Sequence, residues 1–167
     1  MTDGYRFTAG GAAAINAEAD RYDVILNPFS SVDLTQVELE DVPEKHKHYE
    51  AVRFNYENLL MFADENNVFG VDDTATVGDL CGALYALIGE DGTSQYSAIY
   101  FLQQYGIVSK DYNVSDELTG PIANEILDYF TQAIQCDYVY KMPYKKAVTR
   151  GELADIIMGY YDSLPEE

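Results

Sequence analysis

Three similar helix starts recur along the chain, and this recurrence constrains the fold more than any other feature. The clearest is the phrase Thr149-Arg150-Gly151-Glu152. Thr149 can accept a hydrogen bond from the amide of Glu152, and the Glu152 side chain can reach back to the amide of Thr149, which is a capping box. A helix is therefore predicted to begin near Thr149, with apolar residues at helical spacing: Leu153, Ile156, Ile157 and Tyr160.

The same pattern occurs twice upstream. Thr76 and Asp79 have the spacing of a second capping box, and a helical apolar stripe follows them. Thr119 precedes a third stripe, although Ile122 stands where the other two starts have an acid. Three such starts predict a repeat.

The first two capped helices are each preceded by a predicted helix and a loop. In the first unit, about residues 40–89, the leading helix carries apolar positions from Tyr49 to Ala63. In the second unit, about residues 90–134, the leading helix stops at Gly106, a residue that suits a left-handed helix end.

The third unit, about residues 135–164, has too few residues before Thr149 for a full leading helix. Either the repeat is truncated, or the first helix of the domain supplies the missing partner. Helical units of this size cannot bury their apolar faces alone, so we expect the three to close into one mainly α-helical body.

Residues 1–39 differ from this pattern. An Ala/Gly-rich stretch at 9–14 precedes residues 22–26, which are predicted to be a short strand or extended segment that ends at Asn27-Pro28. We therefore expect an irregular N-terminal arm or linker at 1–39 and a helical repeat domain at 40–167.

Composition excludes several classes of partner. The chain holds 29 acidic and 10 basic residues, a net charge of −19, which opposes binding to nucleic acids and anionic lipids. No apolar run approaches the roughly 18 residues that a membrane span needs. The N-terminus lacks a signal-peptide pattern, which leaves either a cytoplasmic protein or a mature piece of a larger exported chain.

Two cysteines, Cys81 and Cys136, leave the redox compartment open. Cys81 lies among apolar residues of a predicted helix, where a small buried thiol is the commonest arrangement. A disulfide between the two cysteines is the alternative, since spacing alone does not place them within bridging distance.

Residues 40–164 resemble the repeats of the S-layer homology family. The opening phrase of that family is similar to residues 41–52, which begin Asp41-Val42-Pro43, and its glycine loop to Phe69-Gly70-Val71 and Gly106-Ile107-Val108. Its Thr-Arg-Ala-Glu phrase most closely resembles residues 149–152.

The resemblance implies a pseudo-threefold helical module that holds bacterial surface proteins noncovalently on a peptidoglycan-linked secondary polysaccharide, often one with acidic sugars. It also implies that the arginine of the Thr-Arg phrase binds the polymer in a groove between repeats. Of the three units, only the last has an arginine at this position, Arg150. Val77 and Gly120 occupy the corresponding positions of the first two units.

The distribution of positive charge points to the same region independently. Seven of the ten basic residues fall in two windows, one at Lys45, Lys47 and Arg53 and the other at Lys141, Lys145, Lys146 and Arg150. If the last unit lies against the first, the windows can flank one groove suited to a carboxylate-bearing glycan. The alternative is ordinary surface pairing with neighbouring acids.

Chemistry other than glycan binding has little support. His46 and His48 could ligate a metal from an extended segment, but no third ligand is evident. No nucleophile elbow, zincin helix, phosphate loop or dinucleotide fingerprint occurs. We therefore expect neither catalysis nor a cofactor.

Taken with the resemblance, these features lead us to expect a noncovalent anchor on the bacterial cell surface, outside the cell, that binds a cell-wall secondary polysaccharide or another peptidoglycan-linked polymer. Its expected glycan-binding residues are Arg150, Lys145, Lys146, Lys47, Tyr144 and Tyr49, and its expected helix caps are Thr76, Asp79, Thr119, Thr149 and Glu152. The alternative is a degenerate helical repeat that serves as a spacer or docks another surface protein.

Overall fold

The computed structural model describes residues 33–89, 94–137 and 147–164, and this part of the chain is mainly α-helical, as the sequence predicts. The predicted features at 9–14 and 22–26 lie outside the described residues. The elements are η2 (Leu34–Gln36), α2 (Tyr49–Glu57), α3 (Val77–Leu87), α4 (Gln95–Gln104), α5 (Gly120–Ile134) and α6 (Arg150–Ser163).

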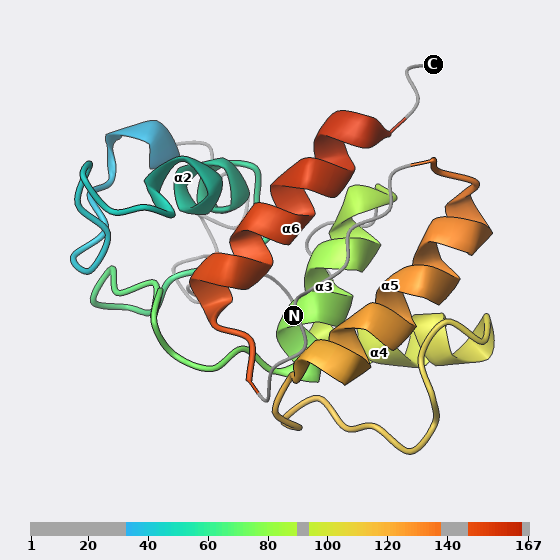
Figure 1. Ribbon diagram of the computed structural model, residues 1–167. Helices are drawn as coiled ribbons and strands as arrows, with labels where there is room; N and C mark the ends of the chain where they lie inside the picture. Colours follow the sequence, from blue (N-terminus) through green and yellow to red (C-terminus); the bar gives the residue numbers. More distant parts are fainter. Residues whose placement is uncertain (1–32, 90–93, 138–146, 165–167) are drawn as a thin grey trace, which may run out of the picture.

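The first helix of the domain packs against the last. Figure 1 shows α2 crossing beside α6, while α3 lies at the centre and α4 packs against it. Asn55, buried on α2, donates a hydrogen bond from Nδ2 to the carbonyl oxygen of Ala154 on α6 at 3.0 Å. This packing of α2 on α6 is the one expected if the first helix of the domain supplies the partner of the short third unit.

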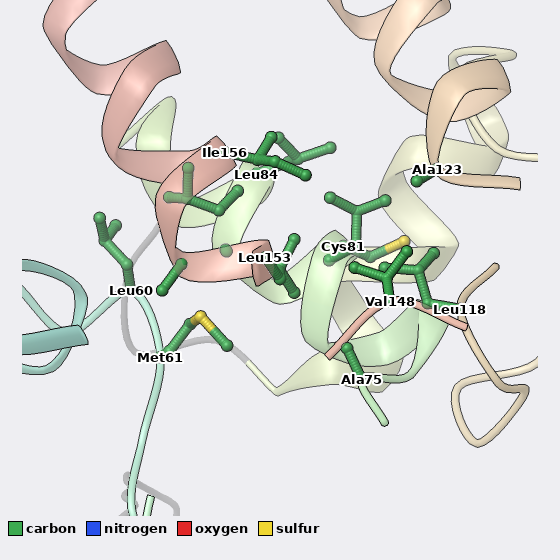
Figure 2. Packing of buried hydrophobic residues seen from close by; sticks show 14 of the residues in the cluster. Leu60, Met61, Ala75, Cys81, Leu84, Leu118, Ala123, Val148, Leu153 and Ile156 are labelled. Carbon is green, nitrogen blue, oxygen red and sulfur yellow. The ribbon is translucent and has the colours of Figure 1, made fainter. Parts of the chain in front are cut away.

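A closed ring of backbone hydrogen bonds joins the residues that precede the three capping threonines. The amide of Ala75 donates to Val148 O at 2.7 Å, Val148 donates to Leu118 O at 3.0 Å, and Leu118 donates to Ala75 O at 2.9 Å. All three residues are fully buried, and Figure 2 shows them gathered in the core. The three helix starts therefore converge on one point of the fold.

Two loops also form backbone hydrogen bonds with the start of another capped helix: the loop before α3 pairs with α6, and the loop before α5 pairs with α3. The amides of Arg150 and Gly151 donate to the carbonyl oxygens of Asp73 and Val71, both at 2.9 Å. In the same way, the amides of Val77 and Gly78 on α3 donate to the carbonyl oxygens of residues in the loop before α5, Asp116 and Val114. Each of these two loops thus fastens one capped helix to another.

Helix α2 is shorter than the sequence predicts. It ends at Glu57 rather than continuing toward Ala63, because Leu59 adopts a left-handed conformation with φ of 62°. The chain turns there so that Leu60 and Met61 enter the core, where Figure 2 shows both, and their amides donate to Asn55 O. A left-handed residue costs about 1–2 kcal/mol, and burial of two large side chains offsets that cost.

A left-handed turn of the same kind ends α4. It shows that the two glycine loops compared in the sequence, at Gly70 and Gly106, do not correspond. Gly106 has φ of 74°, and the amides of Ile107 and Val108 donate to Leu102 O. Gly106 therefore corresponds to Leu59, not to Gly70, which lies farther along in the loop before α3.

The helical body begins before residue 40. Arg53 on α2 donates from Nη1 to Val37 O at 2.6 Å and from Nη2 to Leu34 O at 2.8 Å, and Leu39 is buried. Residues 33–39, which the sequence assigns to the arm, are thus packed onto α2.

Cys81 and Cys136 are not joined to each other, so the structure does not contain the disulfide that the sequence left open as an alternative. Cys81 is fully buried in the core on α3, and Cys136 is buried after the end of α5. Burial raises the pKa of the Cys81 thiol to about 12.

Candidate functional site

The helix caps lie where the sequence predicts them. Thr76 and Asp79 form a complete capping box at the start of α3, with both hydrogen bonds at 3.0 Å. Thr149 and Glu152 form the second at the start of α6, at 3.1 and 2.9 Å. Thr119 Oγ1 accepts from the amide of residue 122 without a reciprocal acid.

Arg150 is held inside the fold rather than presented to solvent. Its Nε donates to Phe69 O at 2.9 Å, its Nη2 donates to Phe62 O at 2.7 Å, and its Nη1 lies 2.7 Å from Asp79 Oδ1. The guanidinium carbon also stacks 4.7 Å above the centre of the Phe69 ring. Every nitrogen of the guanidinium group therefore has a partner, and the side chain is 16% exposed.

Asp79 connects three elements through one carboxylate. Its Oδ2 accepts from the amide of Thr76 and so caps α3, while its Oδ1 pairs with Arg150 on α6 and accepts from Gln95 Nε2 on α4 at 3.1 Å. The carboxylate is 11% exposed. Because the opposite charge of Arg150 is already paired here, a sugar carboxylate would have to compete with Asp79 for it.

A glycan contact by Arg150 would need a free edge of the guanidinium group. All three of its nitrogens already have partners within the protein. The structure gives this arginine a positioning role, in which it joins the loop at 62–69 to α3 and α6. Its partners lie far away in the sequence, so helix-start spacing could not reveal them.

Lys47 and Tyr49 lie at the N-terminal end of α2, beside the start of α6. His48 Nδ1 is 2.7 Å from Asp155 Oδ2, and a β-carbon at Gly151 would lie only 2.6 Å from the His48 ring. Lys47 is exposed, and Tyr49 is half-buried against the core. We call this region the α2–α6 junction and define it by Lys47, His48, Tyr49, Gly151 and Asp155.

Burial raises the pKa of Asp155 in this junction, and the neighbouring His48 and Lys47 act in the opposite direction. Lys47 is therefore close enough to Asp155 to influence its charge. Arg53, another basic side chain of the first window, is paired with Glu57 at 2.7 Å and bonded to the backbone near η2.

Three expected glycan-binding residues, Tyr144, Lys145 and Lys146, lie outside the described residues, as does Lys141. The structure thus brings Lys47 and Tyr49 to the edge of α6 and turns Arg150 inward.

His46 and His48 make local contacts. His46 Nδ1 accepts from the amide of His48 at 3.1 Å, and its Nε2 lies 3.9 Å from Asp72 Oδ1. Within residues 33–89, 94–137 and 147–164, no three His, Cys, Asp or Glu side chains are grouped so that they could hold a metal ion. In the same ranges, none of the helices combines the length and apolar character needed to cross a bilayer.

Asp41 is an organising residue whose role the sequence did not reveal. Its carboxylate accepts from three consecutive amides, those of Phe69, Gly70 and Val71, at 2.7–2.9 Å. Burial alone would raise the pKa of Asp41, but these hydrogen bonds outweigh it and the pKa is lowered. The sequence feature that could have indicated this role is the position of Asp41 at the start of the phrase Asp41-Val42-Pro43.

The fold and site define a mainly α-helical domain in which three capped helix starts meet at one ring and a largely buried arginine, Arg150, fastens the first unit to the last. No protein-family model matches the chain, and no curated protein matches it in sequence. The resemblance to the S-layer homology family therefore depends on the motifs of this chain alone.

Proposed function

We propose that this chain is a noncatalytic module that binds an acidic cell-wall polysaccharide and so holds a larger exported protein on the bacterial surface. The observation that carries the proposal is the packing of α2 against α6. It brings Lys47, from the first basic window, beside α6, the helix in which the second window ends at Arg150. His48 anchors this contact through Asp155 and Gly151.

Lys47 is the exposed cation of the junction and the proposed contact for a sugar carboxylate, with the exposed part of Tyr49 beside it. Lys145 and Lys146 remain proposed ligands because only three residues separate Lys146 from the start of α6 in the sequence. Arg150 supports the site indirectly, since it fixes α6 to the loop before α3. Local positive charge is needed here because the chain as a whole repels polyanions.

The second candidate is a structural spacer or a docking domain for another surface protein. Two observations favour it. Arg150 is already paired with Asp79, and the corresponding positions of the other two helix starts carry buried residues without charge, Val77 and Gly120.

Sedimentation with bacterial sacculi tests the proposal. We expect the purified chain to pellet with sacculi that retain their acid-labile secondary polymer, and to remain in solution when that polymer has been removed. Lys47→Glu should lower retention several-fold, and added salt should weaken it, because exposed charges are screened.

Lys110→Glu is the matched control. Lys110 is also an exposed lysine, but it lies in the loop between α4 and α5, away from the junction. Equal loss in both variants, or no polymer-dependent retention on walls of several hosts, would favour the spacer or docking candidate. Arg150→Ala is unsuitable as the first variant because it disturbs the fold.

A further inference from the structure

A cluster of aromatic side chains on the outer face of α4 has no role in the junction described above. Tyr96 and Tyr100 on α4 are 75% and 63% exposed, and Tyr105 directly after the helix is 70% exposed, which is unusual for three large rings so close together. With Tyr85 and Phe101 they line an open hollow of about 510 Å³, which we call the tyrosine hollow. Its lining residues come from α4, drawn in yellow in Figure 1, from Tyr105 directly after α4, and, for Tyr85, from α3.

The floor of the hollow is a packed row of rings. The Phe101 ring lies 4.6 Å from that of Tyr85 and 4.7 Å from that of Tyr105, measured between centroids, with tilts of 33° and 38°. Phe101 and Tyr85 are half-buried and pack against the core. Rings held in this way lose little conformational freedom when a ligand binds.

The core uses a different face of α4. Ala98, Ile99 and Leu102 are buried, and they connect the helix to the rest of the domain. The exposed tyrosines are therefore not needed to bury α4. On α2, the residue that corresponds to Tyr100 is Arg53, which is bonded to the backbone near η2.

The polar groups around the hollow are neutral. Its lining adds Ser97 and Gln104 to the tyrosines, and no charged side chain of the described residues lines it. Hydroxyl and amide groups can both donate and accept hydrogen bonds, as sugar hydroxyls do, while aromatic faces suit the apolar CH face of a sugar ring. Among the described residues, the lining offers no cation to an acidic ligand and no carboxylate to a cationic one.

We infer that the tyrosine hollow is a binding site for a neutral glycan, in which sugar rings stack on Tyr96, Tyr100 and Tyr105 above the Phe101 floor. The site is built on α3 and α4, whereas the α2–α6 junction is built on other helices. The inference therefore does not depend on the junction binding an acidic polymer.

Affinity electrophoresis of the whole chain through gels containing hydroxyethyl cellulose, mannan, galactan or dextran tests the inference. Titration with the hexamer of N-acetylglucosamine, followed by tyrosine fluorescence, adds a soluble probe; the chain contains 15 tyrosines and no tryptophan. We expect at least one of these neutral glycans to bind. Added salt should leave that binding almost unchanged, unlike binding of an acidic polymer at Lys47.

Tyr100→Ala and Tyr96→Ala should each weaken binding several-fold, up to about tenfold, as expected for loss of one stacked ring. Tyr100→Phe should retain much of it. Tyr129→Ala is the matched control, because Tyr129 is 49% exposed but lies on α5, outside the hollow. Circular dichroism checks that the variants remain folded.

The inference is overturned if no neutral glycan of this panel binds, or if Tyr129→Ala weakens binding as much as Tyr100→Ala. A proline-rich peptide tests the competing class of ligand, since such peptides also dock on aromatic grooves. Binding of that peptide in the hollow, with no glycan binding, would likewise overturn the inference and assign the hollow to protein docking.

Discussion

Asp79 Oδ1 lies 2.7 Å from Arg150 Nη1, so the carboxylate that caps α3 is also the counter-ion of the first residue of α6. Both side chains are largely buried, and the same oxygen accepts from Gln95 on α4. The Asp79 carboxylate thus connects α3 with α6, which is distant in sequence, and with α4, the next helix along the chain. Its loss should affect the stability of the whole domain.

Arg150→Ala should lower the free energy of unfolding by about 2–4 kcal/mol, because it leaves Asp79 and two carbonyl oxygens without their partner. Urea denaturation measures this change. Lys47→Ala, at an exposed position, should change stability by less than about 0.5 kcal/mol. A similar small change for both variants would contradict the positioning role of Arg150.

Gly78→Ala should destabilise the domain by about 1–3 kcal/mol, because a β-carbon would lie 2.8 Å from the backbone oxygen of Val114 and 2.5 Å from Gln95 Oε1. Gly82→Ala, on the same helix, meets only Gln95 Cγ at 3.4 Å. It should instead stabilise α3 by about 0.5–1 kcal/mol. Thermal denaturation of the pair compares them directly, and equal shifts would argue against close approach at Gly78.

Asp41→Asn should lower stability at neutral pH by about 1–3 kcal/mol, because a neutral amide is a weaker acceptor for the three amides of residues 69–71. The folded-state pKa of Asp41 is lowered, so its contribution is present above the unfolded value of 3.8 and is lost as the pH falls through the folded value.

Denaturation of both proteins at neutral pH and again well below pH 3.8 checks this prediction. The stability difference between the wild type and Asp41→Asn should shrink in acid. A difference that stays constant with pH would show that the charge of Asp41 does not contribute.

Cys81 should resist alkylation by iodoacetamide in the native protein at mildly alkaline pH. Its thiol is buried and has a pKa of about 12, so the reactive thiolate is scarce and inaccessible. Peptide mass spectrometry should detect labelling at Cys81 only after unfolding in urea. Rapid labelling of the folded chain would place this part of α3 outside a stable core.

The helix starts could be predicted because their interactions are local. Thr76 with Asp79 and Thr149 with Glu152 form hydrogen bonds across three residues, a distance that helix geometry sets by itself. The end of α2 could not be predicted in this way. Leu59 is not a glycine, so the sequence does not mark this position as left-handed. Its conformation depends on burial of Leu60 and Met61 by other elements.

The candidate site was predicted less completely. The sequence placed Lys47 and Tyr49 near the last unit, and the packing of α2 on α6 agrees with that placement. It assigned Arg150 to a glycan-binding groove, whereas the partners of Arg150 at residues 62, 69 and 79 become its neighbours only after folding. The tyrosine hollow was missed, although Tyr96 and Tyr100 have the spacing of one helix face.

The sequence by itself determined the mainly α-helical class, the three capped helix starts and the acidic character of the chain. These properties depend on the spacing of nearby residues or on composition, which folding does not change. The tertiary structure alone decided that the first helix packs on the last, that Ala75, Leu118 and Val148 close a ring, and that Arg150 points inward. Each of these contacts joins distant segments, whose meeting depends on the burial of the whole core.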